Sequence, residues 1–347
     1  MPGLVPGIHV VKSGRRSRVG DSLSRNGFSD VFNCRARFDV DGRDKPGHDG
    51  GSAVSTPHAT MLTLLLDGVA YGMLLFVLSC GLAVTLGLMN FINLAHGAFA
   101  MLGGYVTALL MNRAGVPFLA TLPLAFLVPA IVGVALERTL YRRLYGASPL
   151  DQVLFTIGLV FMAMPAANYL LGDQPQQVHL PAFLQGRIEY GGVGVGIYRL
   201  FTILVCGAIA AGLQIFLVGT RFGAQLRAAV DDARAASGLG INVDLLFAVT
   251  FAVGSGLAGL GGALAADVVG GIDPSFPQKF LVIMLIVVTI GGQNGILGAL
   301  FGALLLGVLD VAGKYYVPSI GAFIIYAVMV VTLILRPRGL FAKGDAR

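Results

Sequence analysis

The chain has 347 residues, of which 56% are hydrophobic and only 12% are charged. A soluble domain carries roughly 25% charged residues because its surface must be solvated, so this composition excludes a soluble fold for most of the chain. The three cysteines are too few for a disulfide-rich secreted scaffold. The net charge of +6 does not indicate nucleic-acid binding, because the positions of Lys and Arg matter more than their sum in a membrane protein.

The first sixty residues differ from the rest of the chain. They are rich in Gly, Ser, Arg and Asp and show no apolar period, so they cannot bury enough apolar surface to offset the entropy lost on ordering. Residues 41–49 look like the translation of a repeated intergenic element, and the apolar sequence begins abruptly at Met61. We expect residues 1–60 to be either a disordered tail or an extension from a start assigned too early, with Met61 as the true start.

The remainder predicts an all-α, polytopic transmembrane helix bundle over 61–341 and a short cytoplasmic tail at 342–347. A helix needs about 20 apolar residues to cross the hydrocarbon core. Segment 280–291 is shorter than that and ends in a glycine-rich run, so it predicts a half-helix leading into a break. We expect about eight spans, within a range of seven to nine. The candidate segments are 62–88, 90–111, 116–136, 153–171, 200–218, 244–266, 280–291, 296–313 and 321–335.

Basic residues predict the orientation of the bundle. Loops 137–152 and 219–243 contain three arginines each, and the segment 336–347 contains four basic residues. Loops 172–198 and 267–279 contain one basic residue each. We therefore expect the first three segments to be cytoplasmic and the last two to be external.

Glycine is abundant, with 49 residues, and much of it lies within candidate spans. Gly254, Ala258, Gly262 and Ala266 are spaced by four and therefore share one helix face. Because small residues let helix backbones approach closely, this face predicts packing against other helices.

Three carboxylates fall within candidate spans or near their ends. A charge at the centre of a membrane costs roughly 2.5–3.5 kcal/mol on insertion scales. Asp67, Asp267 and Asp310 all lie close enough to a span end to reach an interface, so we expect them to be solvated there.

The segment from Asn90 to Gly97 carries an unusual polar stripe. Asn90, Asn93 and Gly97 recur at helical i, i+3, i+7 spacing, and His96 stands one turn from Asn93. Donors on such a stripe would be unpaired in lipid, so the stripe should face a cavity or other helices. We expect these four residues to line a translocation pathway, the simpler alternative being that His96 is a structural hydrogen-bonding residue. No second His, Cys or carboxylate stands nearby at ligand spacing, so we expect no metal site, no catalytic site and no cofactor.

A second polar, glycine-rich break follows the short segment 280–291. It contains Gly291, Gly292, Gln293 and Asn294. Non-helical backbone at membrane depth is tolerated only where it is buried in protein or lines a cavity, and broken helices often build transporter sites. We expect these four residues to belong to the pathway, the alternative being a tight turn between two spans.

The loop 219–243 contains a predicted cytoplasmic helix. Residues 225–237 are Ala-rich and favour a helix, which Gly238 and Gly240 should end. Arg227 and Asp231 are spaced i, i+4 and can form an ion pair. A small apolar face suits docking into a groove on another protein, whereas the alternative is a solvated connector. That face consists of Leu226, Ala229, Val230 and Ala233.

Together these stretches resemble the permease subunit of bacterial ABC importers for branched-chain and other hydrophobic amino acids. The likeness runs in order over about 61–341, and the Asn-Leu-Ala-His-Gly sequence at 93–97 looks like the shorter of the two permeases that pair in such importers. Two departures are Gln293-Asn294, where Gly-Ser is usual, and Leu94, where Phe is common. The stretches that carry the likeness are 87–99, 102–105, 227–242, 291–299 and 336–341.

The resemblance implies a multi-pass protein of the bacterial inner membrane that works with other subunits. These are a second homologous permease, two cytoplasmic ABC ATPases and a periplasmic substrate-binding protein. In the family the loop after the fifth candidate span is a coupling helix that contacts the ATPase. The residues to which the likeness assigns this role are Arg227, Asp231, Asp232, Ala235 and Gly240.

The chain itself should be a translocation subunit and not an enzyme. It has no Gly-x-x-x-x-Gly-Lys-Ser/Thr phosphate loop, so ATP hydrolysis would belong to its partners. Branched-chain amino acids are the default substrate of the family, while urea, short amides and aromatic acids are alternatives carried by related permeases. A rival of a different class is an ion-coupled carrier or channel, which would need a buried carboxylate or His relay; the sequence offers only His96 centrally.

Overall fold

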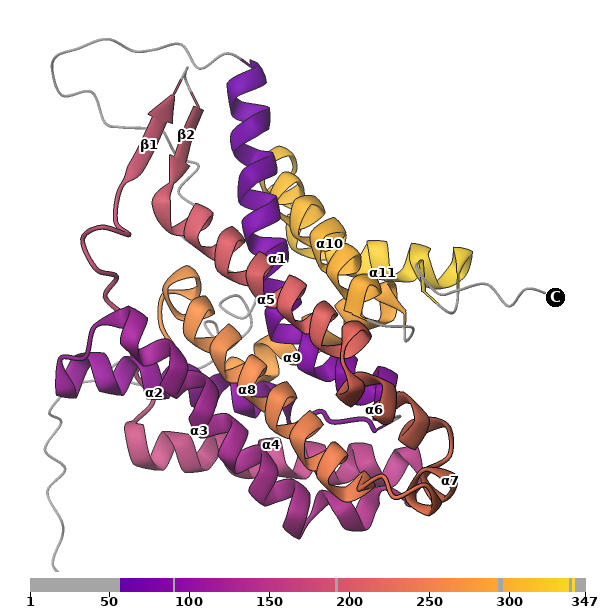
Figure 1. Cartoon of the computed structure of the whole chain (residues 1–347). Coiled ribbons are helices and arrows are strands. Elements are labelled where there is room, and N and C mark those ends of the chain that lie inside the picture. Colours follow the sequence, from indigo (N-terminus) through magenta and orange to yellow (C-terminus); the bar gives the residue numbers. More distant parts are fainter. Residues whose placement is uncertain (1–56, 90, 191–192, 293–295, 337–338, 341–347) are drawn as a thin grey trace, which may run out of the picture. The chain divides into compact units, whose positions relative to one another are not determined.

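The computed structural model describes residues 57–89, 91–190, 193–292, 296–336 and 339–340. Over these residues the chain is mostly helical (Figure 1), as the composition predicts. The expectations for the N-terminal tail and for the tail at 342–347 lie outside the described residues, apart from the start of the first helix at Pro57.

Eleven α-helices and two short 3-10 helices make up the described bundle. Six helices are long and apolar enough to cross a membrane, and two shorter ones are apolar as well, which confirms the all-α multi-pass fold. The predicted half-helix is also short, at 16 residues. The elements are α1 (Pro57–Met89), α2 (His96–Ala114), α3 (Phe118–Thr139), η1 (Tyr141–Leu144), α4 (Pro149–Leu171), α5 (Ile197–Gly219), α6 (Arg221–Asp231), α7 (Ala233–Gly238), α8 (Val243–Val269), α9 (Phe276–Gly291), α10 (Ile296–Tyr316), η2 (Gly321–Phe323) and α11 (Ile324–Leu335).

Helix α1 is the central element of the bundle. It has its most extensive contact with α10 and also contacts α8, α5 and α9. The stretch from Leu74 to Leu78 is fully buried. By contrast, α4 is apolar but mostly exposed within this chain, which suits a surface that contacts lipid or another membrane subunit.

The small-residue face of α8 packs closely on α1 and α2, as its spacing predicts. A Cβ atom placed on Gly254 would lie 3.4 Å from the carbonyl oxygen of Gly81 in α1. A Cβ atom on Gly262 would meet the backbone of Ala100 in α2. The two alanines of this face are fully buried. Close backbone approach, rather than large side chains, therefore holds these three helices together.

Loops that the charge pattern assigns to one side lie together in the structure. At the predicted external end, Gln176 and Ile272 exchange backbone hydrogen bonds of 2.8 and 2.9 Å. At the predicted cytoplasmic end, Arg142 of η1 forms an ion pair with Asp244 in the first turn of α8. An antiparallel hairpin that the sequence did not predict, β1 (Arg187–Tyr190) and β2 (Val193–Gly196), lies in the loop predicted to be external.

The expectation that Asp67 and Asp310 are solvated at an interface is wrong. Both side chains are buried, and each forms an ion pair with a basic residue of this chain. Asp67 of α1 pairs with Arg199 of α5, and Asp310 lies 2.6 Å from Lys314 one turn further along α10. A partner 132 residues away in the sequence could not be identified from spacing alone.

Candidate functional site

The first candidate break lies between α1 and α2. The predicted helix from 90 onward is wrong, because residues 91–95 are not helical and α2 begins only at His96. Asn93 is buried, and its side-chain oxygen accepts a hydrogen bond of 3.1 Å from the backbone N–H of Ala95. An Asn that bonds to its own local backbone favours a turn over a helix. Asn90 lies outside the described residues.

Two side chains of α4 satisfy the irregular backbone of this break. Gln152 Oε1 accepts from the N–H of Ile92 at 3.2 Å, and Thr156 Oγ1 accepts from the N–H of Leu94 at 3.2 Å. Both side chains are buried. Neither residue was predicted from the sequence, although two polar side chains at i, i+4 on an otherwise apolar helix indicate that one helix face meets polar backbone.

His96 is packed in the centre of the bundle. Its imidazole lies against Gly81 in α1, since a Cβ atom on Gly81 would meet the imidazole as well as the carbonyl oxygen of Gly254 in α8. The His96 side chain forms a hydrogen bond with the backbone of Leu78. Its Nε2 atom is buried without a hydrogen-bond partner. The imidazole therefore fits here because residue 81 is a glycine, whose missing side chain leaves room for it.

Gly97, the next residue, brings a fourth helix to the same place. A Cβ atom on Gly97 would lie 3.0 Å from the Cα and carbonyl oxygen of Pro277 in α9. Helices α1, α2, α8 and α9 therefore converge at His96 and Gly97. Over the described residues, no group of three or more His, Cys, Asp or Glu side chains is placed to hold a metal ion.

The second candidate break separates α9 from α10. Gly292 has φ +78° and ψ 159°, a backbone region that is essentially restricted to glycine. A Cβ atom on Gly291 would lie 2.6 Å from both the Gly298 carbonyl and the Ala299 nitrogen, so the two helices touch backbone to backbone. Gln293 and Asn294 lie outside the described residues.

The C-terminal segment packs over this second break. The backbone N–H of Leu340 donates to the carbonyl of Ile290 at 2.9 Å. Gly339 has φ +94°, and a Cβ atom there would lie 2.6 Å from the Cα of Gly292. Three chain segments therefore meet at the break, and each contributes glycine where the backbones are closest.

The predicted cytoplasmic helix over 225–237 is interrupted and forms two helices, α6 and α7. The chain leaves helical geometry at Asp232, where φ is −150° and ψ is 99°. The Asp232 carboxylate accepts hydrogen bonds of 2.9 Å from the N–H groups of Arg234 and Ala235 and caps α7. Asp is a preferred N-cap residue, and this local bond outweighs the helix propensity of the flanking alanines. Gly240 has φ +83° and follows the end of α7, as predicted.

Most of the apolar face that was predicted to dock on a partner points into this chain, and a polar face of α6 and α7 points outward. Leu226 and Ala229 are buried in this chain's own core, and of the predicted apolar face only Ala233 is exposed. Arg227 donates to the backbone carbonyl of Leu217, and the predicted ion pair of Arg227 with Asp231 is absent among the described contacts. The outward face consists instead of exposed residues that include Arg227, Asp231, Asp232, Ala235 and Gly240.

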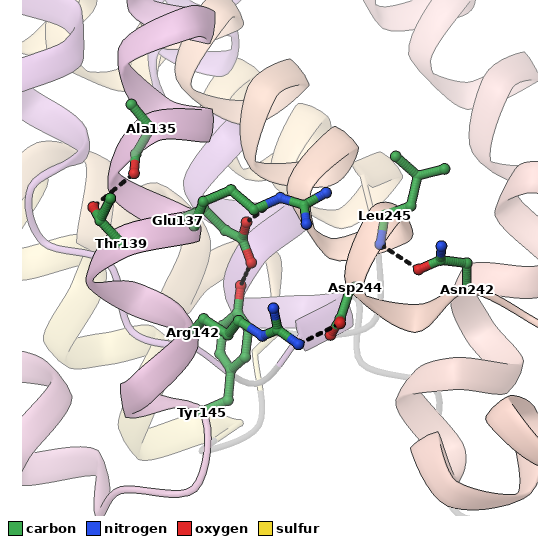
Figure 2. A network of polar contacts seen from close by, with 9 residues as sticks. Ala135, Glu137, Thr139, Arg142, Tyr145, Asn242, Asp244 and Leu245 are labelled. Atoms are coloured by element: carbon green, nitrogen blue, oxygen red, sulfur yellow. Dashed lines mark hydrogen bonds and ion pairs between the residues drawn. The ribbon is translucent and has the colours of Figure 1, made fainter.

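A polar network joins α3 and η1 to the start of α8, close to α7 (Figure 2). The Tyr145 hydroxyl donates to Oε1 of the buried Glu137 side chain at 3.0 Å. Nε of Arg138 lies 3.6 Å from the other oxygen of the same carboxylate. Burial raises the pKa of Tyr145, and the nearby Glu137 carboxylate raises it further, so the phenol stays protonated and keeps donating. Asp244 pairs with Arg142 on the surface of this network. Glu137 was not predicted from the sequence.

Comparison with known proteins identifies the family. A family model described as the permease component of the branched-chain amino acid transport system matches residues 64–333. The chain belongs to this permease family. The match contains α2 to α10, both breaks and the α6–α7 segment, and it confirms the resemblance seen in the sequence.

Several curated permeases are similar to this chain. BraD of Pseudomonas aeruginosa, named a high-affinity branched-chain amino acid transport system permease, is 26% identical over 82% of this chain and 96% of its own length. LivH of Escherichia coli is 27% identical with the same coverage. LivM of Salmonella typhimurium is 26% identical, but only 69% of its length is covered. The match therefore covers nearly the full length of BraD and of LivH, but a smaller share of LivM. No solved structure matches the chain.

Proposed function

We propose that this chain is the membrane-spanning permease subunit of a binding-protein-dependent ABC importer for branched-chain amino acids in a bacterial inner membrane. The observation that carries the proposal is the family match over residues 64–333, which contains nearly the whole described bundle. The similarity to permeases named for branched-chain amino acid transport supports the substrate class. The chain has no P-loop, so the energy would come from partner ATPases.

The proposed partners are a second homologous permease, two cytoplasmic ATPases and a periplasmic substrate-binding protein. Helices α3, α4 and α5 expose large apolar side chains, among them Ile131, Phe161 and Leu204, which suit contact with lipid and with a second permease. The outward polar face of α6 and α7 suits contact with an ATPase, because exposed Arg227 and Asp231 present opposite charges there.

The proposed pathway passes the place where α1, α2, α8 and α9 converge. His96 and Gly97 are buried there in the present conformation, so substrate passage would require these helices to separate. Asn90 and Asn93 on one side, and Gly291, Gly292, Gln293 and Asn294 on the other, belong to the two breaks that such a movement would use. The non-helical backbone described at Asn93 and Gly292 supplies points where helices can move as separate segments.

Uptake measurements test the function. Deleting the gene should abolish uptake of radiolabelled leucine, and unlabelled isoleucine or valine should compete with leucine in the complemented strain. Urea, acetamide and phenylalanine should compete poorly. Depleting ATP while a membrane potential is maintained should stop uptake, whereas an ion-coupled carrier would continue. Uptake that depends on the ion gradient and is insensitive to ATP depletion would contradict the proposal.

The ATPase-coupling role of α6 and α7 has its own test. Arg227→Glu reverses a charge on the outward face, and like charges at an interface can cost several kcal/mol. We expect leucine uptake to fall about tenfold or more while the amount of protein in the membrane stays normal. Arg113→Glu, an exposed charge reversal in the last turn of α2, is the matched control. Normal uptake and normal ATPase association in Arg227→Glu would remove Arg227 from the coupling face.

A further inference from the structure

One cavity lies away from both breaks, at the predicted external end. Its volume is about 600 Å³, within the range of about 300–1,000 Å³ that is typical of small-molecule sites. The external loop, the start of α5 and the end of α8 form its walls. Several residues of the loop that line it are exposed, so the cavity is accessible from that side.

The cavity wall carries both signs of charge. Arg187 of β1, Arg199 of α5 and Asp267 of α8 all line it. Arg199 is held from behind by Asp67 of α1, whose side chain is completely buried and whose second carboxylate oxygen has no hydrogen-bond partner. A fixed guanidinium is pre-organised to bind a carboxylate, and a carboxylate such as Asp267 suits an ammonium group.

The rest of the wall is partly apolar. Val178, Leu184 and Val268 line the same cavity as the three charged residues, and Val178 and Leu184 are themselves buried. An aliphatic side chain placed against them would lose contact with water, which is favourable. The cavity therefore combines a basic group, an acidic group and an aliphatic surface in one space.

We propose that this external cavity binds a free aliphatic L-α-amino acid, with its carboxylate at Arg199, its ammonium group at Asp267 and its side chain against the aliphatic wall. The proposal rests on the proposed function and assigns a substrate-binding site to the external face of the permease. Neither break contributes to this cavity, so the site is separate from the pathway residues at His96 and Gly291.

Arg199 also places the site on a route into the bundle. It lines a second, much smaller space of about 10 Å³ between α1, α5 and α8, behind the external cavity. Such a volume holds roughly one water molecule, and most of its wall is apolar. Arg199 therefore borders both spaces, and a substrate carboxylate that binds Arg199 from the external cavity competes with its ion-pair partner Asp67.

Direct binding to the purified full-length chain in lipid nanodiscs tests the proposal. Radiolabelled L-leucine should bind, while 4-methylpentanoate and 3-methylbutylamine, which each keep only one of the two charges, should compete at least tenfold more weakly. Arg199→Gln and Asp267→Asn should each weaken leucine binding about tenfold to a hundredfold, as expected when a charge-assisted hydrogen bond is lost. Arg113→Gln, on the same side but outside the cavity, should bind normally.

Arg199→Gln leaves Asp67 buried without its partner and can unfold the protein. The double variant Asp67→Asn/Arg199→Gln removes both charges and should fold, yet it should still lack leucine binding. The chain contains no Trp, so Phe183→Trp in the external loop adds an independent fluorescence signal that leucine should change.

Leucine binding that is undetectable in the wild type, or that is unaffected in Asp267→Asn and in the folded double variant, would overturn the site. That outcome is distinct from failure of the proposed function. If the cavity does not bind leucine but gene deletion still abolishes leucine uptake, the importer assignment stands and only this site is wrong. If the deletion strain takes up leucine normally, the proposed function itself fails.

Discussion

The two helix breaks are stabilised by opposite means. At the break between α1 and α2, side chains supply what the backbone lacks, because Gln152 and Thr156 of α4 accept hydrogen bonds from the N–H groups of residues 92 and 94. At the break between α9 and α10, the absence of side chains is what matters. Gly291 and Gly292 allow backbones to touch and adopt angles that other residues avoid.

This difference predicts opposite responses to substitution. At the first break, removing polar atoms leaves a buried N–H without a partner, which costs roughly 1–3 kcal/mol. At the second break, adding a single methyl group forces two backbones apart. One break therefore depends on chemical groups that lie about 60 positions further along the chain, while the other depends on the size of its own residues.

The largest effect is expected for Gly291→Ala at the second break. The added Cβ would lie 2.6 Å from the Gly298 carbonyl and the Ala299 nitrogen, and backbone atoms cannot move aside as a flexible side chain can. We expect leucine uptake per folded complex to fall at least tenfold. Uptake and membrane protein levels should be measured together, so that the loss per folded protein is separated from poor assembly.

Gly207→Ala is the matched control for this substitution. Gly207 lies within helix α5, and a Cβ atom there would meet nothing within 4 Å. It should leave uptake unchanged and can stabilise the helix by up to about 1 kcal/mol. Normal specific uptake in Gly291→Ala would show that close packing at the second break has no part in transport.

The next largest effect is expected for Thr156→Val at the first break. Valine has nearly the same shape as threonine but lacks the hydroxyl, so the Leu94 N–H would lose its partner in a buried place. We expect a loss of about 1–3 kcal/mol in stability, measured by thermal unfolding of the purified protein. Thr156→Ser keeps the hydroxyl and should lose less than Thr156→Val.

Thr250→Val separates this contact from the general effect of removing a buried hydroxyl. The Thr250 hydroxyl is buried and donates to the Leu246 carbonyl of its own helix, so its loss leaves no N–H unpaired. We expect a clearly smaller destabilisation than for Thr156→Val. Equal losses in the two valine variants would mean that α4 does not support the first break through this bond.

Sequence patterns predicted the bundle well because membrane spans depend on composition over long windows. The short length of α9, the pairing of loops at each end and the close packing of α8 all follow from apolar runs, basic residues and four-residue spacing of small residues. The hairpin β1–β2 was missed because its strands are only four residues long, which is the shortest run over which an alternating pattern indicates a strand.

The two wrongly predicted helices, from residue 90 onward and over 225–237, have one physical cause. In both, a polar side chain forms hydrogen bonds with the nearby backbone. Asn93 bonds to Ala95 and ends the predicted helical stripe, and Asp232 caps α7 and divides the predicted cytoplasmic helix. Helix spacing and propensity do not include these local bonds. Ion pairs between residues far apart in the sequence, such as Asp67 and Arg199, could not be predicted either, because no spacing rule connects the two residues.

The smallest effect is expected for Gly339→Ala, at the edge of the second break. Gly339 has φ +94°, so an alanine there adopts an unfavourable left-handed conformation at a cost of about 1–2 kcal/mol. Its Cβ would also lie 2.6 Å from the Cα of Gly292. The C-terminal segment can move away from the break more easily than α10 can, so we expect a twofold to threefold loss of uptake, well below that of Gly291→Ala.

Gly115→Ala distinguishes backbone strain from contact at this position. Gly115 also has a positive φ, of +62°, but a Cβ atom there would meet nothing within 4 Å. If Gly339→Ala acts through its contact with Gly292, uptake should fall in Gly339→Ala and stay normal in Gly115→Ala, although both variants lose similar stability. If the two variants behave alike in uptake, the C-terminal segment only adds stability, and the break functions without it. If Gly339→Ala matches Gly291→Ala, the segment is as tightly coupled to the break as α10 is, and the second break involves three chain segments rather than two.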